Sequence, residues 1–163
     1  MRKIIGVILT MACMAACTSI DCPVQNAVYT TYALKKAGGT ADDTLGMDTL
    51  YVAIIRADGT DSLILNGLNG GAVTRFELPI SYTQPEDVFY TLLRDTAGNN
   101  YQDTIRIKKE NYPHFESVDC QVAYFHKITD ASTTHNAIDS IIIHQPDVNY
   151  DVTYVHFYLY LKD

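Results

Sequence analysis

The sequence predicts an all-β domain that follows a signal peptide, folded as an antiparallel two-sheet sandwich of the immunoglobulin-like or transthyretin-like kind. Twelve Tyr residues, with many Val, Ile and Thr, suit a pleated and half-buried surface. Short apolar runs alternate with clusters of Gly, Asn, Asp and Pro. No sustained 3.6-residue apolar period follows the N-terminal apolar run, so we expect no long helix there. A closed barrel is the alternative architecture.

The apolar runs and the turn residues between them define nine expected strands. Asp58-Gly59 predicts a short hairpin turn, because Gly tolerates a positive φ angle. Gly98-Asn99-Asn100 and the segment Pro146-Asp147-Val148-Asn149 predict two further turns. The strands are expected at residues 26–34, 48–56, 61–66, 72–80, 87–94, 101–108, 117–129, 138–145 and 152–161.

The last expected strand shows the clearest two-residue alternation. Aliphatic and aromatic core candidates occupy one face: Val155, Phe157, Leu159 and Leu161. The opposite face carries a different set: Tyr154, His156, Tyr158 and Tyr160. Tyr and His offer flat apolar area with polar tips, which suits protein interfaces and sugar rings, so this face is a candidate binding surface. The alternative is a packed face whose hydroxyl groups reach the rim of the sandwich.

The N-terminus has the layout of an export signal. Arg2 and Lys3 precede an apolar run that ends at Ala16 and is too short to span a bilayer. The run closes with Met14-Ala15-Ala16-Cys17, which resembles the bacterial lipobox, in which the cysteine thiol accepts a diacylglycerol. We therefore expect a lipoprotein signal peptide at 1–16, a lipidated tether at 17–25 that begins at Cys17, and a single β-sandwich domain at 26–163. A rival lipobox ending at Cys13 has a polar Thr10 where an apolar residue is preferred.

The cysteine count supports processing at Cys17 and predicts a disulfide. Removal of residues 1–16 and lipidation of Cys17 leave two thiols, Cys22 and Cys120. Processing at Cys13 would leave three, and an odd thiol is unfavourable in an oxidising compartment. We expect Cys22 and Cys120 to pair with each other.

The charge of the chain argues against nucleic acid as a partner. The formal net charge is −7, and it becomes −9 when Arg2 and Lys3 are removed with the signal peptide. An acidic surface repels phosphate backbones and anionic lipid headgroups. The N-terminal lipid is therefore the expected membrane contact.

The sequence contains no local signature of catalysis, so we expect neither an enzyme nor a cofactor. The motifs of serine hydrolases, zinc proteases, phosphate-binding loops and dithiol oxidoreductases are all absent. His126, His144 and His156 fall on three successive expected strands, where convergent imidazoles would suit zinc. Packing on a polar face is the preferred interpretation of these histidines, and we expect no metal site.

Several short segments in a fixed order resemble a family of small uncharacterised lipoproteins from Bacteroidota, a domain of unknown function. The matching segments are Asp21-Cys22-Pro23, Leu78-Pro79-Ile80-Ser81, Tyr112-Pro113-His114-Phe115 with Asp119-Cys120, and Ile138-Asp139-Ser140-Ile141 with Val148-Asn149-Tyr150-Asp151. The resemblance implies a cell-envelope location and a β-rich domain. It implies no activity, cofactor or catalytic residue.

These observations together favour a non-catalytic cell-envelope lipoprotein that binds another envelope protein or a glycan. The alternative is a fimbrial or surface-assembly subunit that acts by strand exchange. By resemblance to Gram-negative sorting, Thr18 in place of Asp favours the outer membrane. Only Asp21 provides an acidic residue near the lipid, which favours an orientation toward the periplasm.

Overall fold

The computed structural model describes residues 28–56 and 58–162, and this part of the chain contains strands and no helix. It accordingly contains no helix long and apolar enough to cross a membrane. The strands are β1 (Tyr29–Lys35), β2 (Thr49–Ile55), β3 (Asp61–Asn69), β4 (Arg75–Pro79), β5 (Glu86–Arg94), β6 (Asn100–His114), β7 (Ala123–Ser132), β8 (Ile138–Ile143), β9 (Asp147–Val148) and β10 (Phe157–Leu161).

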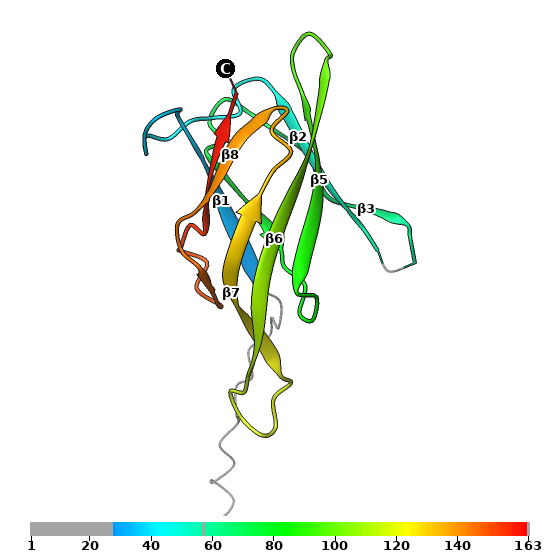
Figure 1. The fold of residues 1–163 in the computed structure, drawn as a ribbon, viewed down its shortest axis with the longest axis vertical. Coiled ribbons are helices and arrows are strands. Elements are labelled where there is room, and N and C mark those ends of the chain that lie inside the picture. Colours follow the sequence, from blue (N-terminus) through cyan, green and yellow to red (C-terminus); the bar gives the residue numbers. More distant parts are fainter. Residues whose placement is uncertain (1–27, 57, 163) are drawn as a thin grey trace, which may run out of the picture.

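The strands form the two packed sheets that the sequence predicts (Figure 1). One sheet has four strands in the order β4-β1-β10-β8, and the other has six in the order β3-β2-β5-β6-β7-β9. The pairing is antiparallel throughout, except that β1 and β10 run parallel. The first and last strands of the domain are therefore neighbours at the centre of the four-stranded sheet.

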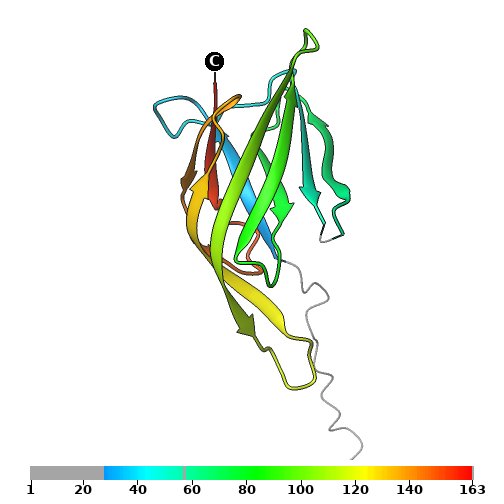
Figure 2. The ribbon, with the colours of Figure 1, turned by 45° about the vertical axis from the view of Figure 1, so that its right-hand side comes forward.

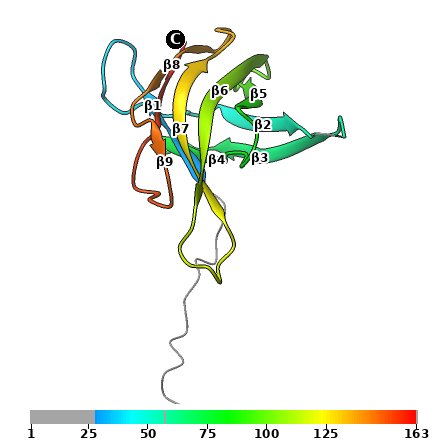
Figure 3. The same ribbon diagram turned by 60° about the horizontal axis from the view of Figure 1, so that its bottom comes forward.

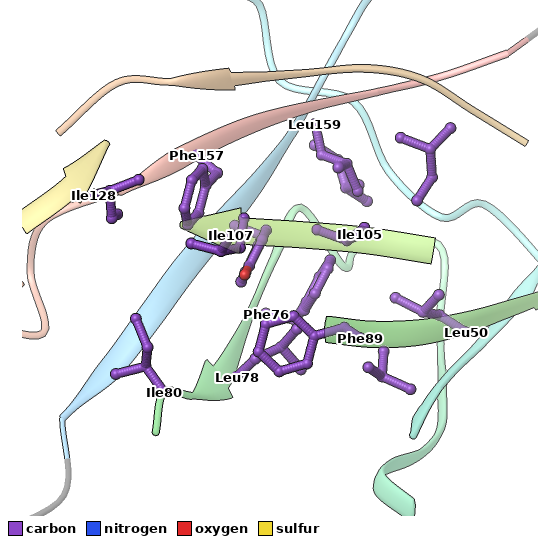
Figure 4. Packing of buried hydrophobic residues seen from close by; sticks show 14 of the residues in the cluster. Leu50, Phe76, Leu78, Ile80, Phe89, Ile105, Ile107, Ile128, Phe157 and Leu159 are labelled. Carbon is purple, nitrogen blue, oxygen red and sulfur yellow. The ribbon is translucent and has the colours of Figure 1, made fainter. Parts of the chain in front are cut away.

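The core lies between the two sheets and follows the alternation of the strands. Ile105 and Ile107 of β6 are buried, while Thr104 and Arg106 point outward. Phe157 of β10 stacks on Tyr32 of β1 at a centroid distance of 4.8 Å. Figure 4 shows Ile105, Ile107 and Phe157 among core side chains that come from both sheets. The labelled core residues are Leu50, Phe76, Leu78, Ile80, Phe89, Ile105, Ile107, Ile128, Phe157 and Leu159.

Two hairpins leave the body of the sandwich. The β2–β3 hairpin diverges from β5 and β6 because the six-stranded sheet is strongly twisted (Figures 1 and 3). Its turn at Asp58-Gly59 forms as predicted, with Gly59 at φ 80° and the Asp58 carboxylate accepting from the Thr60 N–H at 2.9 Å. The β6–β7 hairpin projects beyond one end of the sandwich (Figure 2).

Two expected strands begin later than the sequence indicates. The strand expected at 117–129 begins only at Ala123, because β6 continues to His114 and the intervening residues form the connection. The strand expected at 152–161 begins only at Phe157. Asn149 and Asp151 accept hydrogen bonds from backbone N–H groups two residues ahead, which folds the chain into turns before β10.

Candidate functional site

The tyrosine face expected on the last strand exists in part. Tyr158 and Tyr160 lie on the outer face of the four-stranded sheet, and both are half-buried by contacts within the chain. Tyr158 stacks on His144 at 4.3 Å, and the Lys35 ammonium lies 4.8 Å from the centre of its ring. The Tyr160 hydroxyl donates to the Gly39 carbonyl at 3.0 Å. These intramolecular partners leave the face little free aromatic area.

His156 and Tyr154 do not join this face, which corrects the sequence-based expectation. His156 is 1% exposed, and its Nδ1 accepts a hydrogen bond from the backbone N–H of Thr31 at 3.0 Å. Burial lowers the pKa of His156, so the ring is held neutral. Tyr154 is exposed in the loop before β10. The two-residue alternation of the sequence continues backward over residues 152–156, but these residues do not belong to β10.

The three histidines considered for zinc do not converge. His126 lies on β7 of the six-stranded sheet and approaches Asn111 at 2.8 Å. His144 packs on the outer face of the other sheet, and His156 is turned toward the backbone of β1. Among residues 28–56 and 58–162, no group of three or more His, Cys, Asp and Glu side chains is placed to hold a metal ion.

A groove on the outer face of the six-stranded sheet provides a surface that the sequence analysis missed. Its volume is about 670 Å³, and we call it the tyrosine groove. Its lining comes from β2, β3, β5 and β6 and from the connection between β7 and β8. The lining residues are Tyr51, Ala53, Ile55, Asp61, Leu63, Tyr90, Thr91, Leu92, Gln102, Asp103, Thr104, Thr134 and Asn136.

The groove has an apolar floor, and the register of the strands determines which residues lie side by side on it. Ala53, Tyr90 and Thr104 are direct neighbours across β2, β5 and β6, and all three point away from the core. Ala53 leaves space above the sheet because its side chain is small. Ile55 and Leu63, on the diverging β2–β3 hairpin, are exposed large aliphatic residues beside the floor. Exposed apolar residues gathered in a hollow are typical of binding surfaces.

Polar groups surround this floor. Asp61 carries a carboxylate at the hairpin side of the groove, and the Arg94 guanidinium lies 5.7 Å from the centre of the Tyr51 ring. On the opposite side, the Asn136 side-chain amide donates to the Gln102 carbonyl at 2.6 Å. The arrangement offers flat aromatic rings together with amide, hydroxyl and carboxylate groups.

Asp103 holds the polar side of the groove in place from below. Its carboxylate accepts hydrogen bonds from the Thr134 hydroxyl and from the backbone N–H groups of Asn136, Ala137 and Ile138, at 2.6–2.9 Å. Burial alone would raise the pKa of Asp103, but these four hydrogen bonds outweigh it and lower the pKa. An ionised Asp103 therefore fixes the connection that follows β7.

A buried ion pair lies elsewhere in the six-stranded sheet. The Lys109 ammonium, whose side chain is wholly buried, contacts the Asp87 carboxylate at 2.6 Å, the Ser81 hydroxyl at 3.2 Å and the Gln84 carbonyl at 2.7 Å. Three acceptors satisfy its three donors, so the group anchors the connection before β5. Burial, and then the charge of Lys109, lowers the pKa of His126 to about 4. The residues of this cluster do not line the tyrosine groove.

The predicted lipidation site and one of the predicted disulfide cysteines lie outside the described residues. These are Cys17 and Cys22. Cys120 lies in the connection between β6 and β7. Lipidation and the Cys22–Cys120 pair therefore stay predictions.

Comparison with known proteins identifies the family of the chain without assigning an activity. No curated protein and no solved structure matches it. A family model described as "Family of unknown function (DUF6452)" matches residues 49–161, which span β2 to β10 and include every residue of the tyrosine groove. The chain belongs to this family of unknown function, DUF6452.

Proposed function

We propose that the mature chain is a non-catalytic, lipid-anchored module of the bacterial cell envelope that binds a protein or a glycan through the tyrosine groove. The observation that carries the proposal is the groove itself, a hollow of about 670 Å³ with exposed aromatic and aliphatic residues on its floor. Monomeric proteins rarely leave such surfaces open without a use.

The chemistry of the groove suits a ligand with flat apolar faces and many hydroxyl or amide groups. Tyr90 and Tyr51 offer ring faces that contact large apolar area at low conformational cost. Asp61, Gln102 and Asn136 supply donors and acceptors around them. Sugar rings and extended peptide segments both fit this description, and neither requires a catalytic residue.

The envelope location is supported by the first eighteen residues. Met14-Ala15-Ala16-Cys17 resembles a lipobox, and Thr18 follows the cysteine, as in lipoproteins sorted to the outer membrane. A lipid anchor at Cys17 would hold the domain on the membrane even though its acidic surface repels anionic lipid headgroups. Replacement of Cys17 by Ser should release a soluble or unprocessed form, and a mature N-terminus without an acyl group would contradict the anchor.

Site-specific photocrosslinking in the native envelope tests the binding proposal. A benzoylphenylalanine at Tyr90 should yield adducts with a distinct protein or glycan. The matched control is Tyr154, which has nearly the same exposure (46% against 41%) but lies outside the groove. Equal adduct yields at both positions would contradict the proposal. A ladder of multiples of the chain itself would favour the alternative, an assembly subunit.

Strand exchange is the weaker of the two hypotheses because the sheet edges suit it poorly. β9 has two residues, β4 has five and β8 has six, so each of these edge strands offers a short edge. β3 is longer, but its pairing with β2 is interrupted by two register shifts, which bend the strand. A partner strand therefore has no long, regular template among the described residues.

A further inference from the structure

The tip of the β6–β7 hairpin carries a cluster of apolar side chains that no other part of the described chain covers. The hairpin tip, residues 112–122, contains Tyr112, Phe115, Val118 and Val122. Phe115 is 65% exposed and Val118 is 99% exposed, which is far from the ordinary environment of such residues. The tip is also the part of the domain that projects furthest from the sandwich (Figures 1 and 2).

The stem of the hairpin holds this tip away from the body. Cross-strand pairs continue from Arg106 opposite Ser132 to His114 opposite Ala123. At the end of the stem, His114 stacks on Phe125 at 4.1 Å, and Tyr150 packs edge-on against Phe125 at 5.0 Å. The register shifts once, between Lys108 and Lys109, and the pairing is regular from there to His114. This regular outer part of the stem and its aromatic packing support the exposed tip.

The tip lies at the end of the sandwich where the described chain begins. The Val28 carbonyl accepts a hydrogen bond from the Ile80 N–H, and the segment that follows Ile80 holds Lys109 at the base of the hairpin. Ten residues lie between Cys17 and Val28, so eleven residue-to-residue steps (28 − 17) join them. At ~3.3–3.6 Å per extended residue, a lipid on Cys17 lies within ~40 Å of Val28. The tether therefore leaves the domain at the end from which the hairpin projects, and its length keeps that end near a membrane that holds Cys17.

We propose that the hairpin tip seats in the headgroup region of the membrane that holds the lipid anchor, and so fixes the orientation of the domain. The inference rests on the lipid anchor of the proposed function. Phe115 and Val118 would enter the boundary between headgroups and acyl chains, and Tyr112 would lie at headgroup level. Glu110, Glu116 and Asp119 are close by, so the charge of this region suits zwitterionic headgroups and opposes anionic ones.

The absence of tryptophan from the chain gives a direct test. V118W places a single Trp at the hairpin tip, and M47W places one in the β1–β2 connection at the opposite end of the sandwich (Figure 1). Met47 is 82% exposed, so neither change disturbs the core. Each full-length variant is reconstituted in phosphatidylcholine vesicles with brominated acyl chains, after intact mass has established whether Cys17 is acylated.

The proposal expects a blue shift and bromine quenching for V118W, and neither for M47W. Bromines at shallow acyl positions should quench most, because interfacial groups reach only ~5–10 Å below the headgroups. Phosphatidylglycerol at low salt should reduce the quenching. Acylated V118W that is unquenched, or quenched no more than M47W, overturns the inference but leaves the anchor intact. A blue shift without quenching indicates that protein, from the same chain or a second copy, covers the tip in place of lipid, and it also overturns the inference. A chain without an acyl group refutes the anchor, and the inference with it.

Discussion

Replacement of Asp103 by Asn tests whether one buried carboxylate organises the edge of the tyrosine groove. The change keeps the size and shape of the side chain but removes its charge and turns one acceptor oxygen into an NH2 donor. In the folded protein one oxygen of Asp103 faces Thr134 and Asn136, and the other faces the N–H groups of Ala137 and Ile138. If the NH2 group faces Ala137 and Ile138, both of their N–H groups lose their acceptor. If it faces the other side, the Asn136 N–H loses its acceptor, while the Thr134 hydroxyl can turn and accept from the amide.

The expected loss of stability follows from these four contacts. A hydrogen bond to a charged group contributes ~1.5–3 kcal/mol, and a buried donor left without an acceptor costs ~1–3 kcal/mol. One or two lost bonds, the weakening of the others and partial relaxation of the β7–β8 connection give an expected ~2–5 kcal/mol. That is a large part of the ~5–15 kcal/mol that stabilises an ordinary domain.

Urea unfolding followed by circular dichroism measures the effect, with Asp95→Asn as the matched control. Asp95 is partly exposed in the β5–β6 turn, where its carboxylate accepts hydrogen bonds from Asn99. The same chemical change there should cost much less stability, because water can replace the lost hydrogen bonds. Thr134→Val removes a single bond to Asp103 and should fall between the two, which keeps the test informative if Asp103→Asn does not fold. A loss of less than ~1 kcal/mol in Asp103→Asn, with an unchanged urea slope, would refute the reasoning.

Three further predictions concern the core, a buried histidine and the cysteines. Phe157→Ala should cost ~3–5 kcal/mol in urea melts because the ring is fully buried, whereas half-buried Tyr158→Ala should cost clearly less; equal losses would contradict this. The free energy of unfolding should fall as the pH drops from 6.5 toward 4, because unfolded His126 binds a proton in this range while the folded ring, with a pKa of about 4, does not. The fall should be smaller in His126→Gln, and an unchanged slope would show that other groups cause it. Non-reducing peptide mapping of envelope-purified protein should recover Cys22 and Cys120 as one crosslinked peptide, and recovery of both as free thiols would end that proposal.

The sandwich was predictable because its strands and turns follow two local rules: buried and exposed residues alternate along a strand, and tight turns favour Gly. Alternation places Ile105 and Ile107 in the core, and the strand expected at 101–108 contains both, although β6 continues to His114. Asp58-Gly59 marks its turn because few other residues accept the positive φ found at Gly59. Both rules act between neighbours in the chain, so the sequence displays them directly.

The candidate site was not predictable because it depends on relations between distant strands. Tyr51, Ala53 and Tyr90 are separately visible as outward residues of two strands, but the hollow above them comes from the twist that carries β3 away from β5. The same limit affected His156. His156 lies in an alternating run, which indicates an exposed face. In the structure the ring is buried, and it accepts a hydrogen bond from the backbone N–H of Thr31, which lies 125 residues away in the chain.

The parallel pair at the centre of the four-stranded sheet makes the whole chain necessary for the fold. Tyr32 of β1 is paired with Phe157 of β10, and these residues are separated by 125 positions. β10 lies between β1 and β8, so a chain that ends before Phe157 exposes Tyr32 on the core side and leaves β8 without its partner. Contacts of such sequence separation form late, because the loop they close is long. The domain therefore completes its core only when its last strand is available, and truncation at the C-terminus should be as damaging as loss of β1.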